Sequence, residues 1–233
     1  MNRISILVFI FALAFAFFII SPGLLNKPFT PLPELKIADV LDLFTPLILI
    51  PLYYLLLYFG SSQVPSLKST IIFLVFSVLW VEGQAMHLAA NSIGHWLVNF
   101  INEYVYHVAH FYDEILSHII WHLGVAALSA QLIYRSWRYP YEDLSSRLIL
   151  ESIAGLVYGL TIFIMGIEGG TVLLLFPFSI LAAILSLILG RKMLREVPVL
   201  TFFLVGYTLA AVLYAGWGIY WGSFPQFSHL GWI

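Results

Sequence analysis

Residues 171–190 read TVLLLFPFSILAAILSLILG and contain no Asp, Glu, Lys or Arg. A helix that crosses a bilayer needs about 20 mostly apolar residues, because in hydrocarbon every backbone polar group must be hydrogen-bonded within its own segment. This stretch meets that requirement over its whole length. It indicates an integral membrane protein built from helices.

The composition of the whole chain agrees with this stretch. Of the 233 residues, 61% are hydrophobic and only 9% are charged, whereas about 25% of the residues of a soluble domain are charged. So few polar side chains cannot cover a globule in water, which excludes a soluble enzyme. The formal net charge of -2 gives no basic stripe for nucleic acid. Because the chain has no cysteine, disulfides and thiolate chemistry are excluded too.

Outward from 171–190, six more apolar runs predict membrane spans, separated by segments with Pro, Gly and charged residues. The seven predicted spans are 4–20, 40–60, 70–100, 113–137, 148–168, 171–190 and 199–221. We therefore predict an all-α polytopic membrane protein with about seven transmembrane helices, in a single domain over 1–233. The run 4–20 follows Arg3 as in a signal peptide, but it is too long for one, so we expect an uncleaved helix.

Lys and Arg are distributed unevenly between the two sides that seven spans define. Cytoplasmic loops are the richer ones in Lys and Arg. One side has Lys27 and Lys36. The other side carries Arg3, Lys68, Arg135, Arg138, Arg147, Arg191, Lys192 and Arg195. This asymmetry predicts an N-inside, C-outside orientation, and in the absence of a transit segment we expect a prokaryotic cytoplasmic membrane.

Six of the seven histidines lie between Lys68 and Arg135, in a stretch without any cation. This stretch contains His87, His95, His107, His110, His118 and His122, with Glu82, Glu103, Asp113 and Glu114. An Asp, Lys or Arg at the centre of a bilayer costs about 2.5–3.5 kcal/mol on insertion scales. So many ionisable groups within predicted spans therefore predict a functional site.

Helical spacing divides these residues into two polar stripes, because residues four apart share a helix face. The third span presents Gln84, His87, Asn91 and His95, and the fourth presents His110, Glu114, His118 and His122. The two spans are consecutive and antiparallel, so we expect the stripes to meet in the outer half of the membrane. Glu168, at the outer end of the fifth span, is expected at the same level, whereas Glu82 lies about 140° around the helix from His87.

Imidazole and carboxylate groups at one depth are typical ligands of zinc or iron. The predicted metal ligands are His87, His118 and His122, with His95 and His110 competing for places. Asp113 or Glu114 would be a ligand or the general base of a catalytic water. The residues predicted to support the ligands by hydrogen bonds are Asn91, Gln84, Glu82 and Glu168. A site near the outer interface predicts a metal-dependent enzyme, such as a hydrolase, that acts on a lipid-like substrate.

Other uses of the same histidines stay open. They could hold a haem, conduct protons or metal ions, or only form hydrogen bonds between helices or with a partner subunit. A retinal protein is excluded, because 199–221 contains no lysine for the Schiff base. Residues 118–122 (HIIWH) match the HxxxH box of membrane di-iron enzymes, but the chain has no adjacent His-His pair for their HxxHH box.

In span number and in its histidines and acids, the chain resembles the seven-span metal hydrolases that include alkaline ceramidases and progestin/adiponectin receptors. That group has an HxxxH pair on its last helix. Here the pair is His118 and His122, on the fourth predicted span, and 199–221 contains no histidine. We therefore assign the chain to no family.

Overall fold

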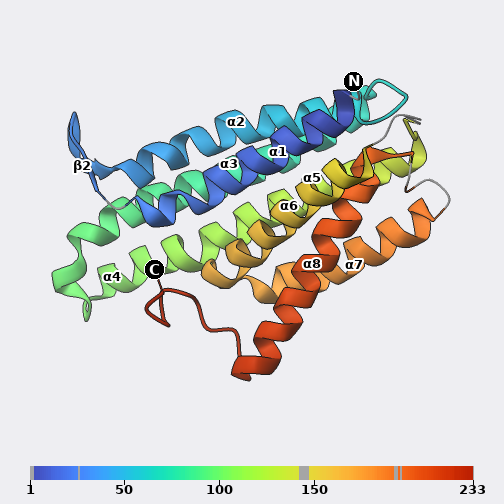
Figure 1. Ribbon diagram of the computed structural model, residues 1–233. Coiled ribbons are helices and arrows are strands. Elements are labelled where there is room, and N and C mark those ends of the chain that lie inside the picture. The colour runs from blue at the N-terminus through green and yellow to red at the C-terminus, as the bar shows by residue number, and fades with distance from the viewer. Residues whose placement is uncertain (1–2, 26, 142–146, 192–193, 195, 233) are drawn as a thin grey trace.

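The computed structural model describes residues 3–25, 27–141, 147–191, 194 and 196–232. Within these residues, seven helical segments are long and apolar enough to cross a membrane, and they form one bundle (Figure 1). They are α1 (Arg3–Ile20), α2 (Ile37–Phe59), α3 (Leu67–Trp96), the continuous segment Tyr104–Arg138, α6 (Leu148–Glu168), α7 (Val172–Gly190) and α8 (Pro198–Trp221). The prediction of an all-α membrane protein with seven spans is confirmed.

The segment Tyr104–Arg138 has three parts: α4 (Tyr104–His110), the π-helical turn η3 (Phe111–Leu116) and α5 (Ser117–Arg138). It starts earlier than the predicted span 113–137. Conversely, α3 ends before the predicted limit of 100, where the short 3-10 turn η2 (Val98–Phe100) begins the connection to α4. The predicted third span is too long because apolar residues continue past the end of α3, at Leu97, Val98 and Phe100. The predicted fourth span begins too late because His107 and His110 interrupt the apolar run at the start of its helix.

A small antiparallel hairpin lies between α1 and α2. It follows the 3-10 turn η1 (Pro22–Leu24) and consists of β1 (Pro28–Phe29) and β2 (Leu32–Lys36). The hairpin lies at the same end of the bundle as α4 (Figure 1). We call this end the hairpin end, and the opposite end, where α1 begins, the N-terminal end.

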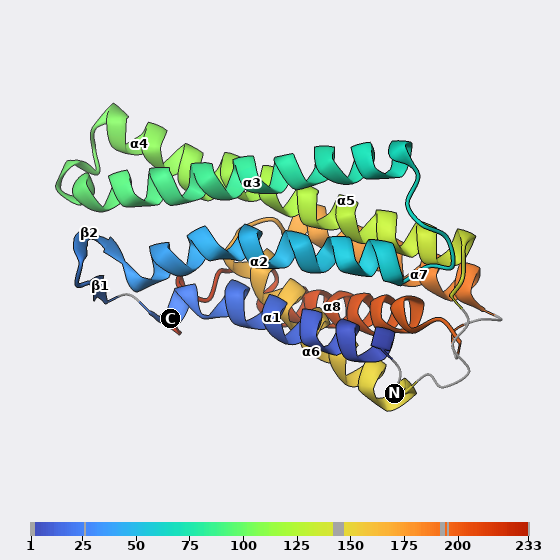
Figure 2. The same ribbon diagram turned by 90° about the horizontal axis from the view of Figure 1, so that it is seen from above.

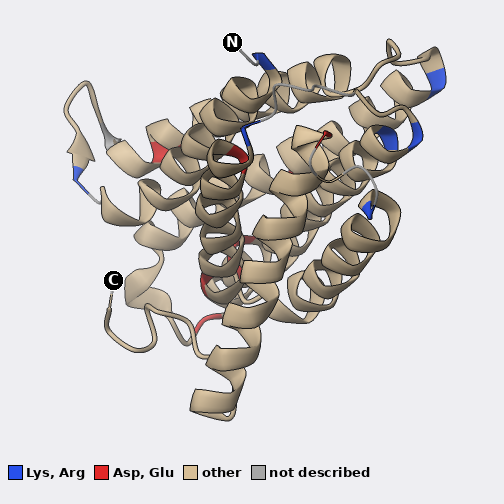
Figure 3. Ribbon diagram, turned by 45° about the vertical axis from the view of Figure 1, so that its right-hand side comes forward, with Lys and Arg blue, Asp and Glu red and all other residues tan. Residues whose placement is uncertain are grey.

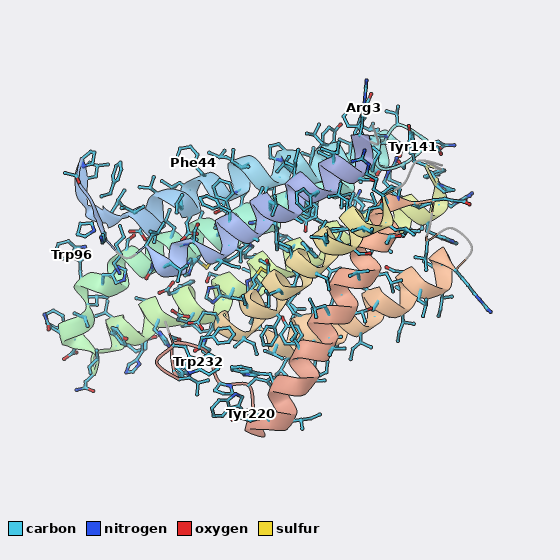
Figure 4. All side chains as sticks on the ribbon, in the orientation of Figure 1. Arg3, Phe44, Trp96, Tyr141, Tyr220 and Trp232 are labelled. Carbon is cyan, nitrogen blue, oxygen red and sulfur yellow. The ribbon has the colours of Figure 1, made fainter. Side chains whose placement is uncertain are left out.

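Most Lys and Arg of the described residues lie at the N-terminal end, as Figure 3 shows. Arg3 and Tyr141 mark this end in Figure 4, and Trp96 marks the hairpin end. Lys192 and Arg195, which contribute to the predicted orientation, lie outside the described residues. The side of the membrane that each end faces stays a prediction.

The helices pack most extensively as the pairs α3–α5, α6–α8, α7–α8 and α1–α6, and Figure 2 shows α3 beside α5 along one side of the bundle. Glycines allow this α3–α5 contact. A Cβ on Gly83 would overlap the backbone nitrogen of Trp121 and lie 2.7 Å from the Ser117 carbonyl oxygen. A Cβ on Gly124 would lie 2.8 Å from the backbone nitrogen of Trp80. Small residues are used in this way to bring helix backbones together in membranes.

A hydroxyl cluster joins four helices in the middle of the bundle. Tyr158 Oη lies 3.0 Å from Tyr53 Oη, 3.0 Å from Ser129 Oγ and 3.2 Å from Tyr207 Oη. All four side chains are buried. Each hydroxyl has a partner, as an apolar interior requires, so the cluster stabilises the packing of α2, α5, α6 and α8.

Candidate functional site

Three of the five predicted metal-ligating histidines lie together where α3 contacts α5. The ring centroids of His87 and His118 are 4.8 Å apart, and those of His118 and His122 are 5.6 Å apart with nearly parallel planes. His118 and His122 are buried, and the side chain of His87 is 18% exposed. The expected meeting of the two helices is therefore observed for these three residues.

Glycines make the room that these rings occupy. Gly83 lies one helical turn before His87 and allows the backbones of α3 and α5 to touch. At the end of α6, a Cβ on Gly169 would lie only 2.6 Å from Cε1 of His122. The positions of the histidines thus follow from close packing of three helices around them.

Each of the three histidines uses Nδ1 to contact an oxygen atom. Nδ1 of His87 lies 3.4 Å from the backbone carbonyl oxygen of Asp113, its hydrogen-bond partner, and 2.8 Å from Oδ1 of the same residue. Nδ1 of His118 lies 3.0 Å from the backbone carbonyl oxygen of Glu114. Nδ1 of His122 lies 2.5 Å from Oγ1 of Thr171, just before α7. With Nδ1 acting as the donor to these oxygens, Nε2 of each ring is the nitrogen with a lone pair for a ligand.

A cavity of about 510 Å³ opens beside these rings. Its ionisable lining residues are Asp42, His87, Glu114, His118, His122 and Glu168, with no Lys or Arg among the residues that line it. The remaining wall is mainly apolar, and Trp121, Met165 and Phe227 contribute to it. The cavity therefore combines polar groups at one wall with apolar surface for an amphipathic molecule.

The π-helical turn η3 places Asp113 and Glu114. Hydrogen bonds in a π-helix run from i to i+5, so each turn holds an extra residue, and such turns recur at functional sites. Asp113 is buried and reaches His87, while Glu114 lines the cavity. The extra residue also shifts the face of the helix, which is why His110 does not continue the stripe formed by His118 and His122.

His95 and His110 are therefore separate from the other three histidines. Both are exposed. Nε2 of His95 lies 2.7 Å from Nζ of Lys36 in the hairpin, and the ring of His110 is parallel to that of Tyr106. A second cavity of about 440 Å³ brings together the remaining predicted residues of this region, namely Asn91, His95, His110, Asp113 and Glu114.

Gln84 supports an aspartate rather than a histidine. Its Oε1 accepts a hydrogen bond from Trp80 Nε1 (2.7 Å), and its Nε2 donates to the backbone oxygen of Asp42 (3.2 Å). Pro46 lies four residues after Asp42 and has no N–H, so the Asp42 carbonyl oxygen lacks its helical donor. The amide of Gln84 takes the place of that donor.

The two other predicted supporting residues, Glu82 and Glu168, do not contact the histidines in the way expected. Glu82 is exposed on α3 and is not among the residues that line the cavity. Glu168 lines the cavity, but its Oε2 accepts hydrogen bonds from the backbone nitrogens of Phe227 (2.9 Å) and Ser228 (3.3 Å). It thereby holds the C-terminal tail (222–232), which returns along the bundle to Trp232 in Figure 4.

Sequence analysis missed two residues of the site. Asp42 is 7% exposed and lines the cavity. It could have been found, because it is an ionisable residue within the predicted span 40–60 and so meets the criterion applied to the histidines. Thr171 gave no such signal, because a threonine in an apolar run is unremarkable in a membrane helix.

The donor atoms do not converge on one point in this structure. Among the described residues, no group of three or more His, Asp or Glu is placed so that it could hold a metal ion. The predicted metal site is thus not supported by the present side-chain arrangement and stays a hypothesis. Comparison of the chain with protein-family models, with characterised proteins and with solved structures found no match.

Proposed function

We propose that this protein is a metal-dependent membrane hydrolase in which His87, His118 and His122 hold one zinc or iron ion. The observation that carries the proposal is that Nδ1, in each of the three histidines, contacts an oxygen atom. Metal-ligating histidines almost always donate their second nitrogen to a carboxylate, a carbonyl or another oxygen, which fixes the ring and raises its basicity. For His87 and His118 this partner is a backbone carbonyl oxygen, for His122 it is the Thr171 hydroxyl, and all three rings line the same cavity.

The spacing of the rings also supports the proposal. With a zinc–nitrogen distance of about 2.0–2.1 Å and tetrahedral angles, the centroids of two imidazoles on one zinc lie about 5.2 Å apart. The observed separations of 4.8 and 5.6 Å lie on either side of this value. Two of the three ring pairs are therefore spaced as two imidazole ligands of one ion would be.

The remaining residues of the site have matching roles. A metal held by these histidines would supply a water acidic enough to form hydroxide near neutral pH. Glu114 is the proposed general base, because its carboxylate lines the histidine cavity and also the neighbouring cavity of about 440 Å³, which gives the proton an exit. Asp113 and Thr171 are positioning residues for His87 and His122.

The location of the cavity favours a lipid-like substrate. It lies toward the hairpin end, which we expect from the positive-inside rule to face the outer side of the membrane. Its apolar wall suits the chain of an amphipathic molecule and its polar wall suits a hydrolysable head. The haem alternative is less well supported, because His87 and His118 are too close, at 4.8 Å between centroids, for a porphyrin to lie between them.

Metal analysis of the detergent-purified full chain tests the proposal. We expect about one zinc or iron per chain, lost in His118→Ala and in His122→Ala. His95→Ala and His110→Ala are matched controls, because these histidines lie outside the site, and both should keep the metal. Glu114→Gln should keep the metal but lose hydrolysis of membrane lipid extracts. A folded, metal-free wild-type preparation, or equal loss in the two control variants, would overturn the proposal.

A further inference from the structure

A groove of about 660 Å³ runs between α2 and α3 on the surface of the bundle. Its apolar lining residues are Leu43, Pro46, Leu47, Ile50, Pro51, Val81, Ala85, Leu88 and Ala89, and its polar ones are Asp42, Gln84 and Ser92. Leu47 is 65% exposed and Val81 is 44% exposed. Both helices cross the membrane, so these side chains face hydrocarbon. The groove is therefore open to the lipid phase along its length.

Asp42 lies between this groove and the histidine cavity, because it lines both. The aspartate is held in place at this junction by Gln84, whose Nε2 lies 3.5 Å from its Oδ1 and 3.2 Å from its backbone oxygen. A molecule in the groove would thus have its polar end beside Asp42 and its apolar part against the lipid-facing helices.

The length of the groove corresponds to one leaflet. The rise of 1.5 Å per residue gives about 14 Å between residues 42 and 51 on α2 and about 16 Å between residues 81 and 92 on α3. Half of a hydrocarbon core about 30 Å thick is about 15 Å. The groove begins near the start of α2 at the hairpin end and ends near the middle of the bundle. A transmembrane helix of a partner would need a groove of twice this length.

The charges at the junction restrict the headgroup. The histidine cavity is lined by the carboxylates of Asp42, Glu114 and Glu168 and by no Lys or Arg. With no Lys or Arg among its lining residues, this wall offers an anionic headgroup no cationic side chain, and each carboxylate that is ionised repels such a headgroup. An anionic headgroup is therefore disfavoured.

We propose that the α2–α3 groove binds the acyl chain of a membrane lipid without net negative charge, with its headgroup reaching the histidine cavity past Asp42. The role of the groove as the entry route of a substrate rests on the proposed function. The binding of a lipid in the groove is tested independently of any metal.

Photo-crosslinking tests the groove in the purified full chain in detergent. The probe is phosphatidylcholine with a diazirine in its acyl chain, and adducts are located by peptide mass spectrometry. We expect saturable adducts on residues 43–51 and 81–89, reduced at least fivefold in the double variant Ala85→Phe/Ala89→Phe, whose rings fill the groove. Ala130→Phe on α5 is the matched control, because Ala130 is also exposed, and it should label like the wild type.

Competition tests the headgroup. Unlabelled phosphatidylcholine should displace the probe at several-fold lower concentration than phosphatidylglycerol. Non-saturable adducts all around the bundle, full labelling of the double variant, or equal competition by phosphatidylglycerol would overturn the proposal. The proposal would also be overturned if the wild type were a dimer that dissociates in the double variant, because a second copy of the chain would then occupy the groove.

Metal analysis of the same samples separates this proposal from the proposed function. The double variant should keep the metal content of the wild type. Saturable labelling of a metal-free protein would overturn the proposed hydrolase function but support the lipid site in the groove. A metal-bound protein without saturable labelling would overturn the lipid site but support the hydrolase function.

Discussion

Replacement of Gly83 by alanine should separate α3 from α5 and disturb the site. A Cβ at this position would lie 2.7 Å from the Ser117 carbonyl oxygen and 2.9 Å from Cα of Trp121, where ordinary contact begins at 3.4 Å. Both neighbours are backbone atoms, so no rotamer change can relieve the overlap. The two helices must therefore move apart by at least 0.7 Å, the difference between 3.4 and 2.7 Å.

Gly94→Ala is the matched control on the same helix, because a Cβ there would meet no atom within 4 Å. Alanine is favoured over glycine inside a helix by about 0.5–1 kcal/mol, and this gain is common to both variants. Overpacking costs about 1–3 kcal/mol. We therefore expect the free energy of unfolding of Gly83→Ala to be about 1–3 kcal/mol below that of Gly94→Ala.

Reversible unfolding in mixed micelles of dodecyl maltoside and SDS, followed by circular dichroism, measures this difference. Metal content should fall in Gly83→Ala as well, because His87 moves with α3 away from His118. Equal unfolding free energies of the two variants would refute the argument that backbone contact at Gly83 sets the spacing of the helices.

Two further changes test positioning contacts. Thr171→Val removes the hydroxyl that contacts Nδ1 of His122. Because loss of such a partner costs about 10- to 100-fold in metal affinity, we expect a decrease of this size. Competition with a chromophoric chelator measures the affinity, and an unchanged value would contradict the role of Thr171. Glu168→Ala removes the carboxylate that accepts the backbone N–H groups of Phe227 and Ser228, hydrogen bonds worth about 1.5–3 kcal/mol each when charged. Limited proteolysis should then cleave the tail 222–232 at least tenfold faster, whereas cleavage at the wild-type rate would show that other contacts hold the tail.

The sequence predicts the spans well because hydropathy is a local property. The predicted span 148–168 coincides with α6, and 4–20 differs from α1 by one residue. Within a regular helix the predicted side-chain neighbours are also correct, since His118 and His122 share a face of α5. The prediction is wrong at His110, because the π-helical turn at 111–116 depends on hydrogen bonds that apolar spacing does not reveal.

The sequence by itself determined that this chain is a helical membrane protein, how many times it crosses, and in which half of the spans its histidines lie. Only the tertiary structure decided which polar groups meet. Gly83 brings His87 to His118, Thr171 reaches His122 from the start of α7, and Asp42 joins the site from α2. Each of these contacts depends on the packing of helices far apart in the chain, and within a membrane that packing is selected by close backbone approach and buried hydrogen bonds rather than by hydropathy.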